Sequence, residues 1–217
     1  MSKYDAVFFD LDGTLVDTAP DLAYAINQVL TEYGKPEVPL ERLRSVASDG
    51  SPGLIRLAFN ITPDMNAYDA IQKRFIELYQ THITRESALF DGMQEVLVKL
   101  EEMDMKWGVI TNKPEFLTTP LMAALSLDDR AVSIVSADTT PHSKPHPAPM
   151  LYACAQANVQ PERCLYIGDA KRDIEAGNNT EMTTLIAAYG YIKDTDSPED
   201  WQADGIIEHP RDILNWL

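Results

Sequence analysis

The sequence predicts an α/β fold in which a doubly wound parallel sheet carries an inserted, all-helical cap domain. Three observations support this prediction. Short apolar runs occur along most of the 217 residues, and most of them lack the polar alternation of half-buried strands. Segments with helical periodicity separate these runs, which implies right-handed β-α-β crossovers. One long interval, residues 17–91, shows helical periodicity alone.

The strands of the core are predicted at the apolar runs. They span residues 5–9, 107–111, 132–136, 164–168 and 183–188, with a weaker run at 205–208. Helical patterns follow at residues 94–103, 115–125, 148–157, 172–178 and 210–216. Because strands that alternate with helices are typical of a parallel sheet covered on both faces, we expect these segments to form the core domain, residues 1–16 and 90–217.

The cap domain is predicted over residues 17–89, after the first strand. Its helices are expected at residues 21–33, 40–46, 54–59 and 68–83. The first of them repeats apolar residues at helical spacing and ends before Gly34-Lys35-Pro36, a helix-stop signal. The chain would cross between the domains at residues 16–19 and 89–92, which are the expected hinges. The apolar core of the cap is expected to include Leu22, Ile26, Phe59, Phe75 and Tyr79.

The chain is strongly acidic. Asp and Glu outnumber Lys and Arg 34 to 18, which gives a formal net charge of −16. Such a surface repels phosphate backbones and anionic lipids, so we expect neither nucleic acid nor a membrane as a partner. The apolar run at the N-terminus is too short for a signal peptide or a membrane span. Two cysteines without a CxxC motif argue against a disulfide scaffold or structural zinc. We therefore expect a soluble, cytoplasmic protein that is a monomer or a weak homodimer.

Four polar clusters are expected at the carboxyl ends of the strands, where parallel α/β sheets bind their ligands. They are Asp10-Leu11-Asp12-Gly13-Thr14, Thr111-Asn112-Lys113, Ser143-Lys144-Pro145, and Gly168-Asp169 with Asp173. Each cluster alone also fits a structural role, as a turn, a helix cap or an exposed loop. Their coincidence on strands that can neighbour one another favours a single binding site.

Several carboxylates would crowd together in that site, namely those of Asp10, Asp12, Asp169 and Asp173. Like charges at this density are unfavourable unless a cation neutralises them. Since no His or Cys accompanies them, the oxygen ligands indicate a hard ion, Mg²⁺. Lys144 adds a fixed positive charge, and free backbone amides in the first two clusters can receive phosphate oxygens. Such a site can also perform covalent catalysis, in which one carboxylate attacks phosphorus and its neighbour handles the proton of the leaving group.

Four motifs resemble those of the haloacid dehalogenase-like hydrolase superfamily. They are DLDGTLVDT at residues 10–18, VITNK at 109–113, SKPHP at 143–147 and GDAKRD at 168–173, in that family's order and spread over essentially the whole chain. The resemblance is closest to the phosphoglycolate phosphatase-like branch, which has a Rossmann-like core and a helical cap between the first two motifs. The YGYI segment at residues 189–192 and the tail around Trp201, Asp204 and His209 look like the subset of that branch acting on N-acetylmuramic acid 6-phosphate.

The resemblance implies a Mg²⁺-dependent phosphomonoesterase for a small phosphorylated metabolite, with 2-phosphoglycolate or N-acetylmuramic acid 6-phosphate as substrate types. Asp10 would be the nucleophile that forms an aspartyl-phosphate. Asp12 would protonate the leaving alcohol and then activate water, and its main-chain carbonyl would bind Mg²⁺. Thr111 and the amide of Asn112 would hydrogen-bond the phosphoryl group. Lys144 would hold the nucleophile and neutralise developing charge.

The fourth motif would complete the metal site that the resemblance implies. Asp169 would bind Mg²⁺ together with the two aspartates of the first motif, and Asp173 would orient a metal-bound water or the lysine. The chain departs from the family pattern at two places. Position 170 is alanine where the family often has serine, so Ala170 offers no hydroxyl to the metal site. Asn179-Thr180 stands where many relatives have Ala-Gly, which concerns the end of a helix and not the chemistry.

The cap must distinguish substrates, because the core contacts only the phosphoryl group. Residues 46–53 are small, polar and turn-prone, and we expect them to form a loop over the leaving group. Arg44 and Arg56 flank this loop, and either can pair with a substrate carboxylate or lie at the surface of the cap. Lys113 can likewise bind an anionic substrate or be exposed. The substrate-binding residues predicted in this way are Thr111, Asn112, Lys113, Ser48, Gly50, Ser51 and Arg56.

Other functions on the same scaffold stay open at this point. A dehalogenase is disfavoured, because the dehalogenases of the family lack the second aspartate, which is present here as Asp12. A phosphosugar mutase shares all four motifs and differs only in its cap, so analysis of the products must separate it from a phosphatase. A non-catalytic binding protein is the remaining alternative, although every expected catalytic position is occupied.

Overall fold

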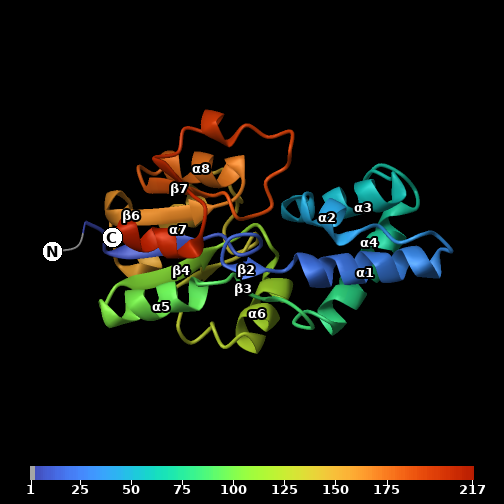
Figure 1. Ribbon diagram of the computed structural model, residues 1–217, viewed down its shortest axis with the longest axis horizontal. Helices are drawn as coiled ribbons and strands as arrows, with labels where there is room; N and C mark the ends of the chain where they lie inside the picture. The colour runs from blue at the N-terminus through green and yellow to red at the C-terminus, as the bar shows by residue number, and fades with distance from the viewer. Residues whose placement is uncertain (1–2) are drawn as a thin grey trace.

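The computed structural model describes residues 3–217, which form two lobes (Figure 1). One lobe holds a parallel sheet flanked by helices, and the other is built from the helices of residues 19–81. The predicted fold class, a doubly wound parallel sheet with an inserted helical segment, is confirmed. Within residues 3–217, no helix is both long enough and apolar enough to cross a membrane.

Six parallel strands form the central sheet, in the order β5-β4-β1-β6-β7-β8. Their bounds are β1 (Ala6–Phe9), β4 (Lys106–Ile110), β5 (Ile134–Val135), β6 (Cys164–Gly168), β7 (Thr183–Ala187) and β8 (Gly205–Ile207). The strand β1 pairs with β4 on one side and with β6 on the other. Each strand lies at one of the predicted apolar runs, because those runs are what the sheet buries.

Helices connect the strands of the sheet. They are α5 (Met93–Glu102), α6 (Glu115–Ala124), α7 (Ala148–Ala157) and α8 (Lys171–Asn178), with the short 3₁₀ helices η2 (Pro161–Arg163), η3 (Pro198–Asp200) and η4 (Pro210–Asn215). The sequence predicted a regular helix at residues 210–216, and this prediction was wrong in type, since the segment is 3₁₀. The N–H groups of Asp212 and Trp216 donate to the carbonyls of His209 and Ile213, which are the i to i+3 bonds of a 3₁₀ helix.

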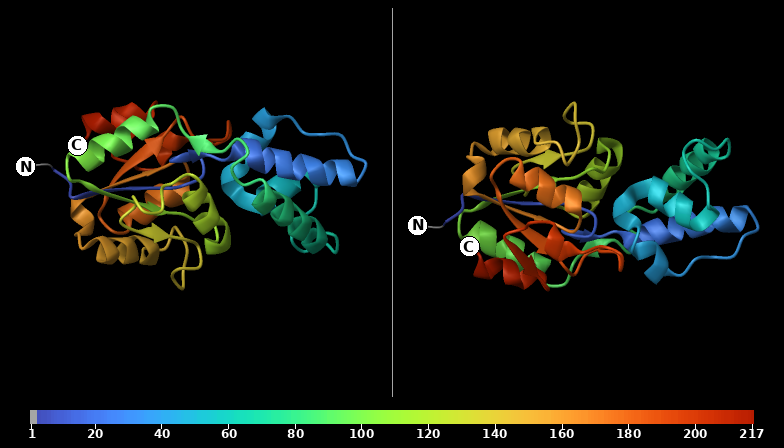
Figure 2. Two further views of the ribbon diagram at one scale, coloured as in Figure 1. Left: turned by 90° about the horizontal axis from the view of Figure 1, so that it is seen from below. Right: turned by 90° about the horizontal axis from the view of Figure 1, so that it is seen from above.

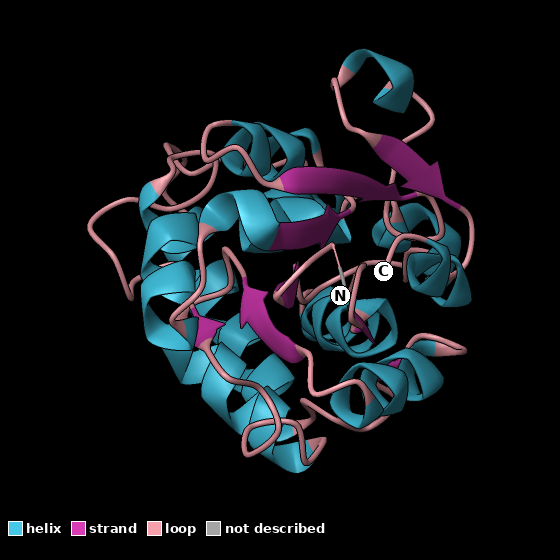
Figure 3. Cartoon of the chain, turned by 90° about the vertical axis from the view of Figure 1, so that its left-hand side faces the viewer, coloured by secondary structure: helices cyan, strands magenta, loops and turns pink. Residues whose placement is uncertain are grey.

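Both faces of the sheet are buried. Successive side chains of β1 point to opposite faces, and Val7 and Phe9 belong to one apolar cluster with residues of α5 and η4. Ala6 and Phe8 belong to a second cluster with residues of α7. Figure 2 and Figure 3 show helices on both sides of the sheet. Burial on both faces is the reason that the strand sequences lack polar alternation.

The helical lobe consists of α1 (Ala19–Glu32), α2 (Leu40–Arg44), η1 (Ala47–Asp49), α3 (Gly50–Phe59) and α4 (Tyr68–Thr81). All five apolar residues predicted for its core are buried. The expected loop over residues 46–53 is instead helical, since η1 is followed directly by the first turn of α3. Pro52 lies in that first turn, where a backbone N–H would have no helical partner, so its missing N–H costs nothing there.

A small second sheet ties the two crossings between the lobes together. β2 (Val16–Asp17) pairs with β3 (Ala88–Leu89) in antiparallel orientation, Val16 opposite Leu89. The sequence predicted no strand between residues 17 and 91, and β3 corrects this. The two crossing segments therefore run side by side at the expected hinges (Figure 1).

Candidate active site

The carboxyl ends of β4, β1 and β6 lie side by side at the edge of the sheet that faces the helical lobe (Figure 1). Asp10 directly follows β1, Thr111 follows β4, and Asp169 follows β6. The N–H of Asp10 donates to the carbonyl of Ile167 at 2.9 Å, so the parallel ladder extends into the site. Lys144 reaches the same place from the loop that precedes α7. The four clusters predicted at separate strand ends therefore meet, as the topology requires.

Three buried carboxylates form a cluster in this site. One oxygen each from Asp10, Asp169 and Asp173 lies within 4.8 Å of the other two. Burial, and then the charges of Asp10 and Asp173, raise the pKa of Asp169 to about 8, and burial raises the pKa of Asp173 as well. The Oδ1 atom of Asp169 is buried and has no hydrogen-bond partner among the described residues. An unpartnered carboxylate oxygen among like charges fits a hard divalent cation such as Mg²⁺.

The side chain of Asp12 forms an ion pair outside this cluster. Lys113 Nζ lies 3.0 Å from Asp12 Oδ1 and 3.3 Å from Oδ2, and the hydroxyl of Thr18 donates to the same Oδ1 at 2.5 Å. Lys113 Nζ is also 2.9 Å from the hydroxyl oxygen of Tyr79. Burial disfavours the charged form of Lys113, but Asp12 and Tyr79 together raise its pKa. The ammonium group of Lys113 is thus held by side chains of its own chain, one of them from α4 of the helical lobe.

Lys144 bridges two carboxylates of the cluster. Its Nζ lies 3.0 Å from Asp10 Oδ1 and 2.7 Å from Asp173 Oδ1, and it also donates to the carbonyl of Ile110 at 2.7 Å. The hydroxyl of Tyr166 lies 2.8 Å from the same nitrogen. The side-chain amide of Asn112 holds the main chain of this lysine, since it donates to the Lys144 carbonyl and accepts from the Lys144 N–H. The Asn112 side chain therefore positions Lys144.

Asp169 is held from both lobes. Its Oδ2 accepts the backbone N–H of Tyr191 at 2.8 Å and the hydroxyl of Ser48, from the helical lobe, at 2.9 Å. Gly13, with φ +87°, packs against this carboxylate so closely that a Cβ atom there would collide with Oδ2. A Cβ at Gly190 would likewise collide with the side chain of Asp169. Glycine at both positions lets the backbone approach the carboxylate.

A cavity of about 610 Å³ opens between the sheet edge and the helical lobe. Six of the seven predicted substrate-binding residues line it, namely Ser48, Gly50, Ser51, Thr111, Asn112 and Lys113, and so do the catalytic candidates Asp10 and Asp12. Arg56 does not line it: its side chain is 63% exposed, and Nη2 lies 3.8 Å from a carboxylate oxygen of Asp49. Apolar side chains form much of the remaining wall, among them Leu22, Phe75, Ile76, Phe116 and Leu117.

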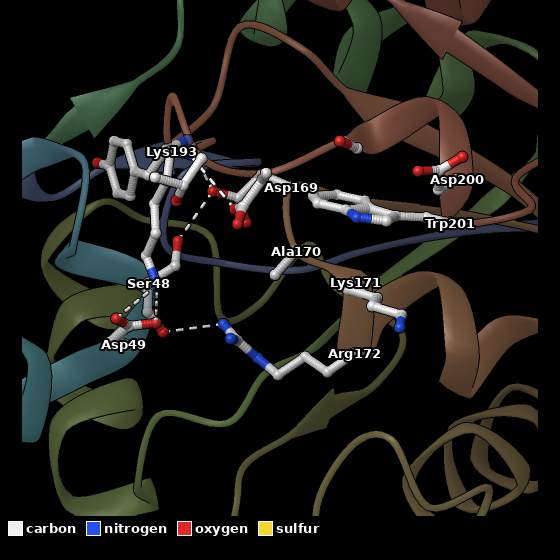
Figure 4. Close-up of a pocket in the computed structure, with 13 residues that line it drawn as sticks. Ser48, Asp49, Asp169, Ala170, Lys171, Arg172, Lys193, Asp200 and Trp201 are labelled. Carbon is white, nitrogen blue, oxygen red and sulfur yellow. Dashed lines mark hydrogen bonds and ion pairs between the residues drawn. The ribbon is translucent and has the colours of Figure 1, made fainter.

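A second cavity of about 470 Å³ lies next to the first, and Asp169 lines this second cavity whereas Asp10 lines the first (Figure 4). Lys193 and the residues after it form part of its wall, together with Lys171 and Arg172 of α8. Lys193 Nζ lies 2.7 Å from Asp49 Oδ2, so this wall is tied to the helical lobe. Ser48, Asp49 and Arg172 line both cavities, which places the guanidinium of Arg172 between them.

Four residues of the site were not predicted in these roles: Tyr79, Tyr166, Arg172 and Tyr191. Tyr166 is a hydroxyl-bearing residue inside the apolar run of β6, and that exception to the pattern was its only signal. Arg172 lies next to Lys171, between two candidate aspartates of the GDAKRD motif, and this position in the motif was its only signal. Tyr79 and Tyr191 come from distant segments, and their contacts follow only from the docking of the helical lobe.

Several known proteins that are similar to this chain are named as phosphatases. Residues 7–187 match the family described as haloacid dehalogenase-like hydrolase. An N-acetylmuramic acid 6-phosphate phosphatase of Pseudomonas aeruginosa is 39% identical over 99% of this chain and 95% of its own length. A phosphoglycolate phosphatase of Xanthomonas campestris is 38% identical over 94% of this chain and 92% of its own. The crystal structure of a predicted phosphoglycolate phosphatase from Haemophilus somnus superposes with a TM-score of 0.87 at 26% identity, covering 99% of this chain and 98% of that one.

Proposed function

This chain belongs to the haloacid dehalogenase-like hydrolase family and is a phosphatase, and we propose that it hydrolyses phosphate monoesters of small metabolites through an aspartyl-phosphate on Asp10. One observation carries the proposal. The buried carboxylate of Asp10 lies at the carboxyl end of the central strand, 3.0 Å from Lys144 Nζ, and lines the cavity. A carboxylate held in this way at the floor of a cavity can attack a phosphorus atom in line with its leaving group.

In the first half-reaction, a carboxylate oxygen of Asp10 forms a bond to phosphorus while the bond from phosphorus to the ester oxygen breaks. Asp12 gives its proton to the departing alcohol. Thr111 and the backbone amide of Asn112 receive the phosphoryl oxygens, and Lys144 offsets the charge near Asp10.

In the second half-reaction, water attacks the aspartyl-phosphate. Asp12 takes the proton of that water, the bond between phosphorus and Asp10 breaks, and inorganic phosphate leaves with Asp10 restored as a carboxylate. Lys113 and Thr18 both donate to the Asp12 carboxylate, which orients this side chain for the proton transfer. The same side chain therefore acts as acid and then as base.

Mg²⁺ is the cofactor that we assign to the carboxylate cluster, and when bound it supplies positive charge to the phosphoryl oxygens. Asp10 and Asp169 would hold it through their carboxylates, and Asp12 through its main-chain carbonyl. Asp173 accepts from Lys144 through Oδ1 and from the Ala170 N–H through Oδ2, which supports an orienting role for this residue beside the metal. The carboxylate chemistry of the site fits a hard ion and offers no soft ligand.

The nucleophile is tested with the variant Asp10→Asn. The amide cannot form the acyl phosphate, so we expect phosphate release to fall by at least about a thousandfold while the thermal unfolding transition is retained. Asp129→Asn, at an exposed position, is the matched control and should keep wild-type turnover. EDTA should abolish phosphate release by the wild-type enzyme, and added Mg²⁺ should restore this activity. Substantial turnover by Asp10→Asn, or indifference to the chelator, would contradict the proposal.

The shape of the cavity favours the larger of the two substrate types. A volume of about 610 Å³ lies in the range of sites for drug-sized ligands, whereas 2-phosphoglycolate is far smaller. The apolar wall of Leu22, Phe75 and Phe116 suits the non-polar faces and substituents of an N-acetylated sugar. We therefore expect kcat/KM for N-acetylmuramic acid 6-phosphate to exceed that for 2-phosphoglycolate by at least about tenfold. A preference in the opposite sense would overturn this assignment of the substrate.

A phosphosugar mutase is the alternative on the same scaffold. Product analysis separates the two reactions, because a mutase returns a phosphosugar whereas a phosphatase releases inorganic phosphate.

We also propose that residues 17–89 form the cap and residues 1–16 and 90–217 the core, and that the protein acts in the cytoplasm as a monomer or a weak homodimer. Light scattering of the purified chain tests its oligomeric state.

A further inference from the structure

Nearly all cationic side chains around the cavity are paired with carboxylates of the chain. Lys144 contacts Asp10 and Asp173, and Lys113 contacts Asp12. On the side of the cap, Arg44 pairs with Asp17, while Arg56 and Lys193 pair with Asp49. Arg172 is the exception: within the described chain, no carboxylate oxygen lies within 4.0 Å of its guanidinium nitrogens.

The guanidinium of Arg172 has unfilled hydrogen-bonding capacity. Arg172 is the second residue of α8, and its side chain extends toward Ser48 and Asp49 of the cap (Figure 4). There, Nη2 donates to the Ser48 carbonyl at 2.9 Å. Its Nε is buried and has no partner among residues 3–217. Of the five N–H donors of a guanidinium, the structure thus assigns a protein acceptor to one.

The charge of Arg172 is retained despite its burial. Burial lowers the pKa of the guanidinium, but the charges of Asp173, Asp10 and Asp169 raise it by more. A half-buried cation that has lost water and gained one hydrogen bond in exchange keeps N–H groups without an acceptor, which is unfavourable. An anionic group that enters the cavity would supply the missing acceptors. A carboxylate suits this place best, because its two oxygens match the planar guanidinium.

We propose that Arg172 determines specificity by binding a carboxylate on the alcohol portion of the substrate, an inference that rests on the proposed phosphatase function. In-line displacement sends the alcohol away from the nucleophile, on the side of phosphorus opposite Asp10. That side faces the cap, and Arg172 contacts the cap at Ser48. The phosphoryl group already has Thr111 and Asn112 at the floor of the cavity, with the buried Lys144 beside Asp10. Arg172, rather than Arg56 or Arg44, therefore meets the substrate's carboxylate.

Two pairs of substrates test the proposal with the Mg²⁺-loaded, full-length enzyme. N-acetylmuramic acid 6-phosphate is compared with N-acetylglucosamine 6-phosphate, which lacks the lactyl carboxylate, and 2-phosphoglycolate is compared with ethyl phosphate. For each pair, the ratio of kcat/KM with the carboxylate to kcat/KM without it is measured. We expect Arg172→Gln to lower this ratio by at least about tenfold, since a charge-assisted pair is lost for one substrate only. Arg172→Lys, which keeps the charge but not the planar geometry, should lie between.

Three results would overturn the proposal. An equal loss on both members of a pair would mean that Arg172 binds the phosphoryl group, and no loss on either would mean that it touches no substrate. A lowered ratio in Arg56→Gln, with Arg172→Gln unaffected, would assign the carboxylate to Arg56. Thermal unfolding and circular dichroism of Arg172→Gln and Arg172→Lys establish that the variants are folded.

A binding measurement separates this proposal from the phosphatase assignment. Calorimetry of N-acetylmuramic acid and N-acetylglucosamine, which carry no phosphate, reports carboxylate binding without turnover. We expect only the acid to bind the wild-type protein detectably, and Arg172→Gln to weaken that binding by at least about tenfold. If this holds while no substrate releases phosphate, the phosphatase function fails and the carboxylate site stands. Equal binding of the acid to wild type and Arg172→Gln would refute the carboxylate site, whatever the turnover.

Discussion

The carboxyl group of Asp169 is buried beside those of Asp10 and Asp173, and its Oδ1 atom has no hydrogen-bond partner among the described residues. Its pKa rises from an ordinary 3.8 to about 8, through burial and then the charges of Asp10 and Asp173. Between these two pH values, the folded protein without a cation binds more protons than the unfolded chain does. The free energy of unfolding of the metal-free protein should therefore fall as the pH rises from about 4 to about 8.

The stabilisation by Mg²⁺ should have the opposite pH dependence. Since the cation binds the ionised carboxylates, it removes the penalty that grows with pH. We expect the increase in Tm on adding Mg²⁺ to be small near pH 5 and largest near pH 8. Differential scanning calorimetry with Mg²⁺ and with EDTA across this range provides the measurement. Asp169→Asn should abolish most of the pH dependence of the increment, and an increment that shrinks toward pH 8 would contradict the carboxylate cluster as the metal site.

Gly13 is the residue whose missing side chain the site needs most. A Cβ atom at this position would collide with Asp169 Oδ2, and the backbone has φ +87°. We expect Gly13→Ala to displace that carboxylate and to lower kcat/KM by about a hundredfold or more, because displacements of about 1 Å have effects of this size. Gly34→Ala is the matched control, with φ +65° and no atom near the added Cβ.

The control separates backbone strain from contact with the site. Alanine in the left-handed region costs about 1 to 2 kcal/mol at either position, so both variants should lose stability in urea denaturation. Only Gly13→Ala should also lose turnover and affinity for Mg²⁺. Equal kinetic losses in the two variants would mean that strain alone explains the effect.

The sequence predicts the floor of the site well and its walls poorly. Asp10, Thr111 and Asp169 each follow a strand, and strand order alone brings strand ends together. The partners of Lys113 come from the first motif and from α4, and no local pattern connects these segments. Arg172 needed the docked cap as well, since its acceptor is a carbonyl of η1. Contacts that depend on how the two lobes dock cannot be predicted from the sequence pattern of any single segment.

At the scale of elements, the long apolar strands and amphipathic helices were predictable and the short elements were not. β1, β4, β6 and β7 consist mostly of apolar residues and are almost entirely buried, and α1 has apolar residues at helical spacing. By contrast, β2 and β3 contain two residues each, which is too short for any periodicity. The first turn of α3, from Gly50, has the composition of a loop. The helix forms there because the chain buries Gly53, Leu54 and Ile55 behind it.

The junction of β2 with α1 depends on a tyrosine from the far end of the chain. The hydroxyl oxygen of Tyr191 accepts the N–H groups of Thr18 and Ala19 at 2.7 and 2.9 Å, and the hydroxyl donates to Asp17 Oδ1 at 2.6 Å. These N–H groups lie at the start of α1, where no carbonyl of the helix can accept them. Tyr191, in the lobe that holds the sheet, thus caps the first helix of the helical lobe.

Removing this hydroxyl should weaken the fold measurably. Tyr191→Phe leaves two buried N–H groups without an acceptor, so we expect a loss of about 2 to 4 kcal/mol in the free energy of unfolding. Tyr189→Phe removes a hydroxyl with one hydrogen bond, 3.1 Å long, to the carbonyl of Thr14, and should cost about 1 kcal/mol or less. Urea denaturation of the two variants compares these effects directly. A loss of equal size in both would refute the capping role of Tyr191.

At the scale of the whole molecule, the predictions of the family and of a phosphatase are confirmed by relatives that match nearly the full chain. The motifs that predicted them lie in the core lobe, apart from the end of the first motif, which passes into the cap. Three of the polar contacts between the two lobes lie around Ser48 and Asp49: Ser48 with Asp169, Arg172 with the Ser48 carbonyl, and Lys193 with Asp49. Because these contacts surround the cavity, opening the cap about β2 and β3 would break all of them at once.

The Lys193–Asp49 ion pair should hold the cap in its closed position. Its two side chains are 32% and 27% exposed, so the pair contributes at most about 1 kcal/mol and is sensitive to salt. We expect Lys193→Ala to raise KM by up to about fivefold, since 1 kcal/mol corresponds to roughly that factor. Lys99→Ala removes the same charge from a pair with Glu102 within α5, away from the cap, and should leave KM unchanged. Raising NaCl should bring the KM of the wild type and of Lys99→Ala toward that of Lys193→Ala, because salt screens the pair that this variant lacks. Parallel salt curves for all three proteins would mean that this ion pair does not control closure.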